Sequence, residues 1–311
     1  MNRSSSAFAR YSLGVLVYNV AVIVWGAFVR ATGSGAGCGD HWPTCNGQVV
    51  PRAPTVQTLI EFAHRATSGV DLVLVVALAV WAFRAFPKGH LARRGAALSA
   101  FFLVTESLLG AGLVLLRLVA QNQSIARAWY LALHLSNTFL LLAALTLNVW
   151  WAYGGGPVRP RRAPVVAGAL GLGAAGLLFV TVAGGITALG DTLFPATSLA
   201  QGIAQDFSPT AHAFLQLRVV HPLAAMVTGL YVIATAWALA SLRRSAPHWR
   251  LAGALTALVL GQVVLGFVNV ALLAPVAIQL LHLALADALW VAFVLFAASL
   301  LSTPRHDPAR G

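Results

Sequence analysis

The chain has 311 residues, 20 of them basic and 8 acidic, which gives a formal net charge of +12. Hydrophobic residues make up 59% of the sequence and charged residues 9%, where soluble domains carry roughly 25% charged residues. This composition excludes a soluble fold, a disordered chain and a disulfide-rich secreted domain. The basic residues lie between apolar runs, so the positive charge indicates membrane topology and no nucleic-acid partner.

Eight apolar runs are long enough to cross a membrane, which requires about 20 residues in a helix. They predict helices near residues 11–30, 60–84, 95–117, 127–152, 164–189, 212–242, 250–273 and 275–301. The first run follows two arginines, as in a signal peptide. It is too long for such a segment and has no small-residue cleavage site, so we expect a retained helix. The sequence therefore predicts an all-α integral membrane protein.

Basic residues also predict the orientation of the spans. With the N-terminus inside, 14 of the 20 lysines and arginines fall in inner segments. We therefore expect a multi-pass protein of a prokaryotic plasma membrane, surrounded by lipid, with both termini in the cytoplasm. Cys38 and Cys45 then share the first outer loop, where an oxidising compartment favours a disulfide. This bridge is either a loop staple or a redox or delivery element beside an active site.

The two halves of the sequence resemble each other. Three short matches keep their order at nearly constant offsets of 158, 156 and 148 residues: 24–27 with 182–185, 109–110 with 265–266, and 133–135 with 281–283. They predict two homologous four-helix bundles, in residues 1–155 and 156–311, related by a pseudo-twofold axis along the membrane normal.

Four of the nine histidines lie a turn or two inside predicted spans. His64, His134, His221 and His282 each follow the outer end of an even-numbered span, so they share one depth, two per half. A single intramembrane histidine commonly makes an interhelical hydrogen bond. Four in register favour metal or heme ligation, with His64 paired to His134 and His221 to His282 in b-type sites. Bare zinc or copper would require further ligands.

Acidic residues distinguish the two halves. Glu61 and Arg65 lie near His64 on one helix, whereas the second half has Arg218 at the position that corresponds to Glu61. The two sites are therefore expected to differ in function. Glu61 is either an acid, base or charge stabiliser beside a cofactor, or the partner of Arg65 in a structural salt bridge.

Other polar residues of the spans leave two interpretations open. The buried acids are either proton-handling groups or hydrogen-bonding struts: Asp71, Glu106 and Asp287. Arg30 and Arg127 lie near the outer surface, where arginine either holds heme propionates or extends to the headgroups without a further role.

Taken together, these motifs are similar to those of the heme A synthase family, over nearly the whole chain. The resemblance rests on eight spans in two four-helix units and on Glu-x-x-His-Arg at residues 61–65. It also rests on single histidines in spans four, six and eight, and on the run GAFVRATGSG at 26–35 followed by Cys38.

The resemblance implies oxidation of the C8 methyl group of heme O to a formyl group, giving heme A for cytochrome oxidase. It implies heme b as cofactor on His221 and His282, the substrate heme O near His64 and His134, and Glu61 as catalytic group. In one branch of the family the cysteine pair is associated with the active site, whereas another branch lacks the pair. Heme O synthase is the implied upstream partner, while an electron-transfer partner and a homo-oligomer stay open.

Two other functions fit the same sequence. A diheme b-type electron-transfer protein would hold two equivalent hemes and would not need Glu61. A heme transporter or chaperone would use the duplication for alternating access.

Overall fold

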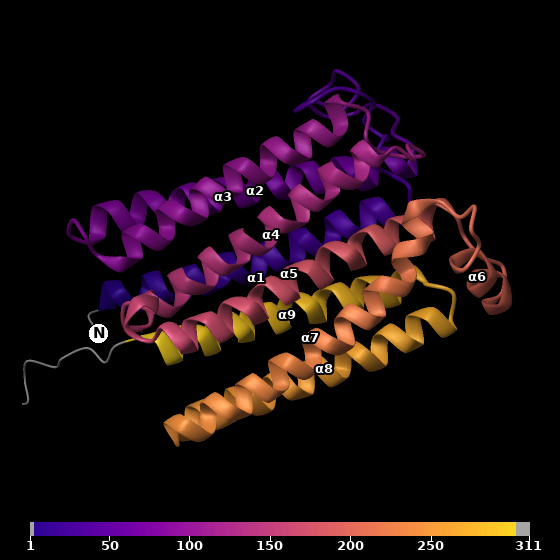
Figure 1. The fold of residues 1–311 in the computed structure, drawn as a ribbon. Helices are drawn as coiled ribbons and strands as arrows, with labels where there is room; N and C mark the ends of the chain where they lie inside the picture. The colour runs from indigo at the N-terminus through magenta and orange to yellow at the C-terminus, as the bar shows by residue number, and fades with distance from the viewer. Residues whose placement is uncertain (1–2, 303–311) are drawn as a thin grey trace, which may run out of the picture.

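The structure is a computed structural model that describes residues 3–302, so both chain termini lie outside the described part. Within these described residues, nine α-helices and one 3-10 turn make up the regular structure, and Figure 1 shows how they are arranged. The long helices are α1 (Arg3–Ala31), α2 (Val56–Ala85), α3 (Leu91–Leu115), α4 (Ile125–Ala152), α5 (Pro164–Leu193), α7 (Ala213–Arg243), α8 (Ala246–Ala271) and α9 (Val276–Leu301).

Each of the eight long helices is long and apolar enough to cross a membrane. They coincide with the eight predicted spans, which confirms an all-α membrane fold. Their ends differ from the prediction, most clearly in α1, which begins at Arg3 rather than near residue 11. The apolar run identifies the part that lies in lipid, whereas the helical backbone continues into the polar flanks.

Two shorter elements were not predicted. These are the 3-10 turn η1 (Pro160–Arg162) and the helix α6 (Leu199–Asp206) between α5 and α7. Ser198 caps α6 by accepting a hydrogen bond from the backbone N–H of Gln201 at 3.2 Å. Arg218 of α7 then pairs with Asp206 at 3.3 Å. Figure 1 shows α6 at the same end of the molecule as the loop between α1 and α2, and we call it the disulfide end.

The long helices form two four-helix bundles. In the first bundle α1 packs on α2, α2 on α3, α3 on α4 and α4 on α1; in the second, α5, α7, α8 and α9 close a ring in the same order. The bundles meet through α1, α4, α5 and α9, as Figure 1 shows. This pairing is what a pseudo-twofold axis between the halves would produce, although the axis itself stays a prediction.

The core lies where the bundles meet. The largest buried side chains there include Phe139 of α4 with Trp290 and Phe296 of α9. The Trp290 indole N–H donates to the Phe139 carbonyl at 2.7 Å. This bond satisfies the one polar group of a large aromatic side chain in an apolar interior.

Candidate functional site

The first loop is fixed to the start of α2. Cys38 and Cys45 form a disulfide, as the sequence predicts. The Thr58 hydroxyl donates to the Gly37 carbonyl at 2.8 Å. A Cβ on Gly37 would lie 2.5 Å from the carbonyl of Gln57, so only glycine allows this contact. The loop is therefore packed directly on the helix that carries Glu61 and His64.

Glu61 is buried beneath this loop. Its exposed fraction is 3%, and both carboxylate oxygens have partners. The Arg65 guanidinium donates to Oε1 at 2.5 and 3.1 Å, and the Cys38 backbone N–H donates to Oε2 at 2.8 Å. Arg65 also donates to the carbonyls of His41 and Thr44 at 2.5 and 2.6 Å. The structural salt bridge considered from the sequence is thus present, and it joins Glu61 to the disulfide loop.

The four intramembrane histidines follow the starts of α2, α4, α7 and α9 by six to nine residues. Each ring faces a glycine of a neighbouring helix. The pairs are Gly26 with His64, Gly110 with His134, Gly184 with His221, and Gly266 with His282. A Cβ on Gly184 would lie 2.7 Å from the His221 ring, and one on Gly26 would lie 3.0 Å from the His64 ring. At Gly184 and Gly26 a Cβ would therefore crowd the ring, whereas at Gly110 and Gly266 it would make ordinary contact at 3.4 and 3.6 Å.

In the second bundle, His221 and His282 lie together. Their ring centroids are 6.5 Å apart. This separation would allow both rings to bind one metal ion, since a metal–nitrogen bond is about 2 Å long. His221 Nδ1 donates to the Val180 carbonyl at 3.1 Å, which leaves Nε2 of a neutral ring unprotonated. His282 Nδ1 is buried and has no hydrogen-bond partner among the described residues.

The first bundle holds His64 and His134. His134 Nδ1 pairs with Glu106 Oε1 of α3 at 2.7 Å, one helical turn before Gly110. His64 Nδ1 is buried without a hydrogen-bond partner in the described part of the chain. Each bundle thus has one histidine anchored through Nδ1 and one without such an anchor.

These residues fit the heme iron that the sequence predicts. Glycines lie beside each ring, two rings are anchored so that Nε2 is available, and two buried ring nitrogens have no partner among residues 3–302. No group of three or more histidines, cysteines or acids is placed to hold a bare metal ion within residues 3–302. Pairs of imidazoles on facing helices are the arrangement used for b-type heme.

Sequence reasoning did not identify the residues that support these rings. Gly26, Gly110, Gly184 and Gly266 all lie in the matched segments of the two halves, so a signal was present in the repeat. The Val180 carbonyl has no sequence signal, because every residue carries a carbonyl group.

The remaining predicted polar residues contact protein groups. Arg30 donates to the Ala188 carbonyl at 2.7 Å and to Gln279 Oε1 at 3.0 Å, and Arg127 donates to the carbonyls of Ala120 and Asn122 at 2.7 and 2.8 Å. Their predicted contact with propionates stays a prediction.

Two buried acids differ in their surroundings. Asp71 accepts from the side-chain amide of Asn19 at 2.6 Å, as a hydrogen-bonding strut would. Asp287 is fully buried, and neither of its oxygens has a hydrogen-bond partner in the described region.

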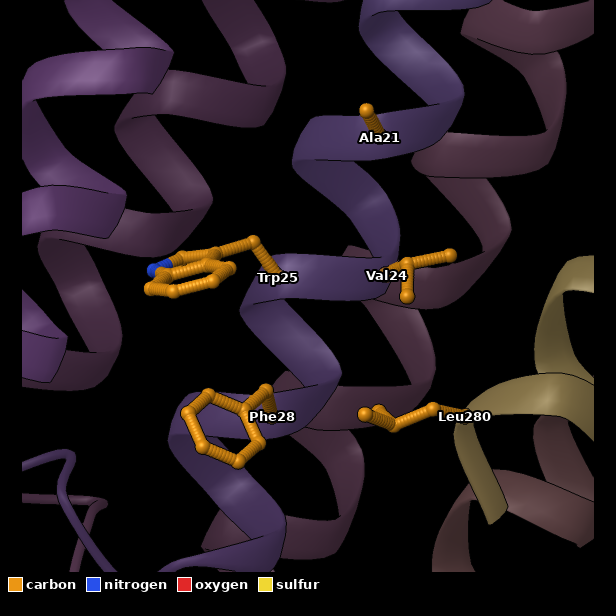
Figure 2. Close-up of a pocket in the computed structure, with 5 residues that line it drawn as sticks. All are labelled: Ala21, Val24, Trp25, Phe28 and Leu280. Atoms are coloured by element: carbon orange, nitrogen blue, oxygen red, sulfur yellow. The ribbon is translucent and has the colours of Figure 1, made fainter. Parts of the chain in front are cut away.

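An apolar groove lies between α1 and α9. It has a volume of about 410 Å³ and is lined by Ala21, Val24, Trp25, Phe28 and Leu280 (Figure 2). The Trp25 indole N–H donates to the Ile60 carbonyl at 3.2 Å, which leaves hydrocarbon to form the walls. The groove suits an alkyl chain better than a charged ligand.

Comparison with known proteins adds a family match. The profile of the family described as cytochrome oxidase assembly protein matches residues 9–294. A protoheme IX farnesyltransferase of Thermus thermophilus is 54% identical over 296 residues, which are 95% of this chain and 49% of that protein.

Two further relatives carry another name. A heme A synthase of Shouchella clausii is 37% identical over 155 residues, covering 50% of this chain and 48% of the relative. A heme A synthase of Halalkalibacterium halodurans is 35% identical over 161 residues, covering 51% and 50%. The chain thus spans about half the length of these curated relatives.

Proposed function

Because the chain belongs to the family of cytochrome oxidase assembly proteins, we propose that it is a heme A synthase. In this proposal it is a membrane oxidoreductase that converts the C8 methyl group of heme O to the formyl group of heme A, an oxidation that takes up an oxygen atom and passes its electrons to a separate electron-transfer partner. The names of the relatives in Shouchella clausii and Halalkalibacterium halodurans support this reaction.

The proposal rests on a difference in charge between the two histidine sites. Both bundles place two histidines against glycines, yet only the first has a carboxylate, Glu61, three residues before its first histidine. At the corresponding position the second bundle has Arg218, which pairs with Asp191 at 2.8 Å. Two equivalent electron-transfer hemes would not require this reversal of charge. A substrate site beside a cofactor site explains it.

The proposal assigns the residues to a cofactor site and a substrate site. His221 and His282 of the second half (156–311) hold heme b, which when bound supplies one-electron redox chemistry. His64 and His134 of the first half (1–155) hold heme O as substrate. Glu61 is kept in place by Arg65 and the Cys38 amide, away from bulk water. Its negative charge stabilises the positive charge that develops as the methyl group is oxidised.

Partners and topology follow from the same proposal. The 54% identical relative is named a farnesyltransferase of protoheme IX, and this chain covers 49% of its length. We infer that an enzyme which farnesylates heme supplies the substrate within the membrane. The disulfide end, with all four histidines near it, faces the outer side, as the distribution of basic residues predicts.

A heme extraction tests the proposal. The chain would be expressed in a host that makes heme O but no heme A, and the extracted hemes separated by chromatography. We expect heme A or its hydroxylated precursor together with heme b. Heme b alone would contradict the synthase and favour a diheme electron-transfer protein.

A variant of Glu61 tests the role of that residue. Glu61→Gln is expected to lower heme A formation by about a hundredfold or more while heme b is retained. The matched control is Asp40→Asn, which changes a largely exposed acid of the neighbouring loop and is expected to have no effect. Unchanged heme A formation in Glu61→Gln would overturn its catalytic role.

A further inference from the structure

Glu106 receives three side-chain donors from α4. His134 Nδ1 lies 2.7 Å from Oε1, the Thr138 hydroxyl also donates to Oε1, and the Asn137 amide donates to Oε2 at 2.6 Å. The carboxylate lies in an apolar helix pair, and 16% of its side chain is exposed. The proposed function assigns it no role.

This contact determines how the imidazole is presented. A carboxylate can only accept a hydrogen bond, so Nδ1 of His134 carries the proton and Nε2 of the neutral ring is free to bind a metal. Gly110, one turn after Glu106 on α3, leaves room beside Nε2, because a Cβ there would lie 3.4 Å from that atom. Carboxylates in this position orient metal-binding histidines and make them stronger electron donors to the metal.

The second bundle has no such arrangement. At the offset of 156 residues Glu106 corresponds to Gln262, whose amide donates to the His282 carbonyl at 3.0 Å and not to the ring. Asn137 and Thr138 correspond, at the offset of 148 residues, to Leu285 and Ala286, which carry no donor side chain. The carboxylate with its three donors therefore occurs in the first bundle but has no equivalent in the second.

We propose that Glu106 is a positioning residue for the substrate heme, acting through His134. It fixes the ring with Nε2 toward the iron and makes that nitrogen a stronger ligand. This inference rests on the proposed function, since it requires a heme in the first bundle.

The packing of α3 on α4 does not depend on Glu106 alone. Asn137 also donates to the Phe102 carbonyl at 2.8 Å and accepts from the Thr105 hydroxyl at 2.7 Å. These contacts remain when Glu106 is replaced, so its variants are expected to fold.

Two substitutions separate positioning from a structural role. Each protein would be purified with its hemes from the host that makes heme O, and the amount and reduction potential of each heme measured. Glu106→Ala is expected to lower occupancy of the first-bundle heme by about tenfold or more while heme b is unchanged. Glu106→Gln still accepts from Nδ1, so we expect heme to stay bound with a higher reduction potential, because a neutral acceptor makes His134 a weaker donor.

The control is Ser107→Ala, which removes the next side chain of α3, a hydroxyl bonded to the Leu103 carbonyl of its own helix. It is expected to change neither heme. Unchanged occupancy in Glu106→Ala, or an unchanged potential in Glu106→Gln, would overturn the proposal. If Glu106→Ala loses both hemes, the reduction potential of Glu106→Gln still shows whether Glu106 acts on the heme through His134.

The wild-type protein separates this inference from the proposed function. If it binds heme O in the first bundle but does not oxidise it, the synthase proposal fails while the role of Glu106 is still decided by the variants. If it binds no heme there, both proposals are overturned, because Glu106 would have no ligand to position.

Discussion

Glycine at position 184 sets the space beside His221. Gly184→Ala is expected to displace the ring, since the new Cβ would lie 2.7 Å from its Cε1 atom. Heme b bound per protein should then fall by about tenfold or more, as measured from pyridine hemochrome spectra. Gly171→Ala is the matched control on α5, because its Cβ would have no neighbour within 4 Å. Equal heme content in the two variants would show that the ring has room to move.

Some functional residues could be predicted from the sequence, and others could not. His64, His221 and Glu61 could be identified because ionisable residues are rare in membrane spans. The pairing of Glu106 with His134 could not be predicted, because the two residues are 28 positions apart and no pattern indicates which faces of α3 and α4 meet. The roles of the histidines as heme ligands stay predictions.

The first loop is an element held by both a covalent bond and hydrogen bonds. Replacing Cys38 and Cys45 by serine opens a closed loop with a sequence separation of 7, which lowers its stability by about 2–3 kcal/mol. We expect faster proteolysis within residues 36–55 with the helices intact, measured by limited digestion in detergent. Val50→Ala, at an exposed position of the same loop, should be cleaved at the wild-type rate. If the double variant is cleaved no faster, the contacts with Glu61, Arg65 and Thr58 suffice to hold the loop.

Long apolar helices could be predicted from the sequence, whereas the short helix outside the spans could not. The eight spans follow directly from hydropathy, because every backbone group in lipid must be paired within a helix. Helix α6 has eight residues and lies outside the spans, so no such constraint reveals it. It depends on the Ser198 cap and on the pairing of Arg218 with Asp206, which are local and tertiary contacts.

On the scale of the whole molecule, Arg30 joins the two bundles. Its guanidinium reaches from α1 to Ala188 and Thr192 of α5 and to Gln279 of α9. Arg30→Gln is expected to lower the free energy of unfolding by about 1–3 kcal/mol, because buried acceptors lose a charged donor. A lower thermal midpoint in detergent would show this.

The control for Arg30 is a second arginine near the same end. Arg117 pairs with Asp40 at 2.7 Å, but their side chains are 77% and 51% exposed. Exposed pairs contribute at most about 1 kcal/mol, so Arg117→Gln should leave the midpoint nearly unchanged. Equal midpoints for the two variants would mean that the hydrogen bonds of Arg30 do not stabilise the contact between the bundles.

The contact of α4 with α9 has an electrical consequence. These two helices lie side by side between the bundles, and each carries one histidine, His134 and His282. The two helices contact each other through buried aromatic side chains, Phe139 and Trp290, whose ring centroids are 5.5 Å apart. With an iron in each bundle, a charge gained at one would act on the other through a poorly screening medium. Oxidation of either centre would then make oxidation of its neighbour harder, so that the pair would titrate as one coupled system.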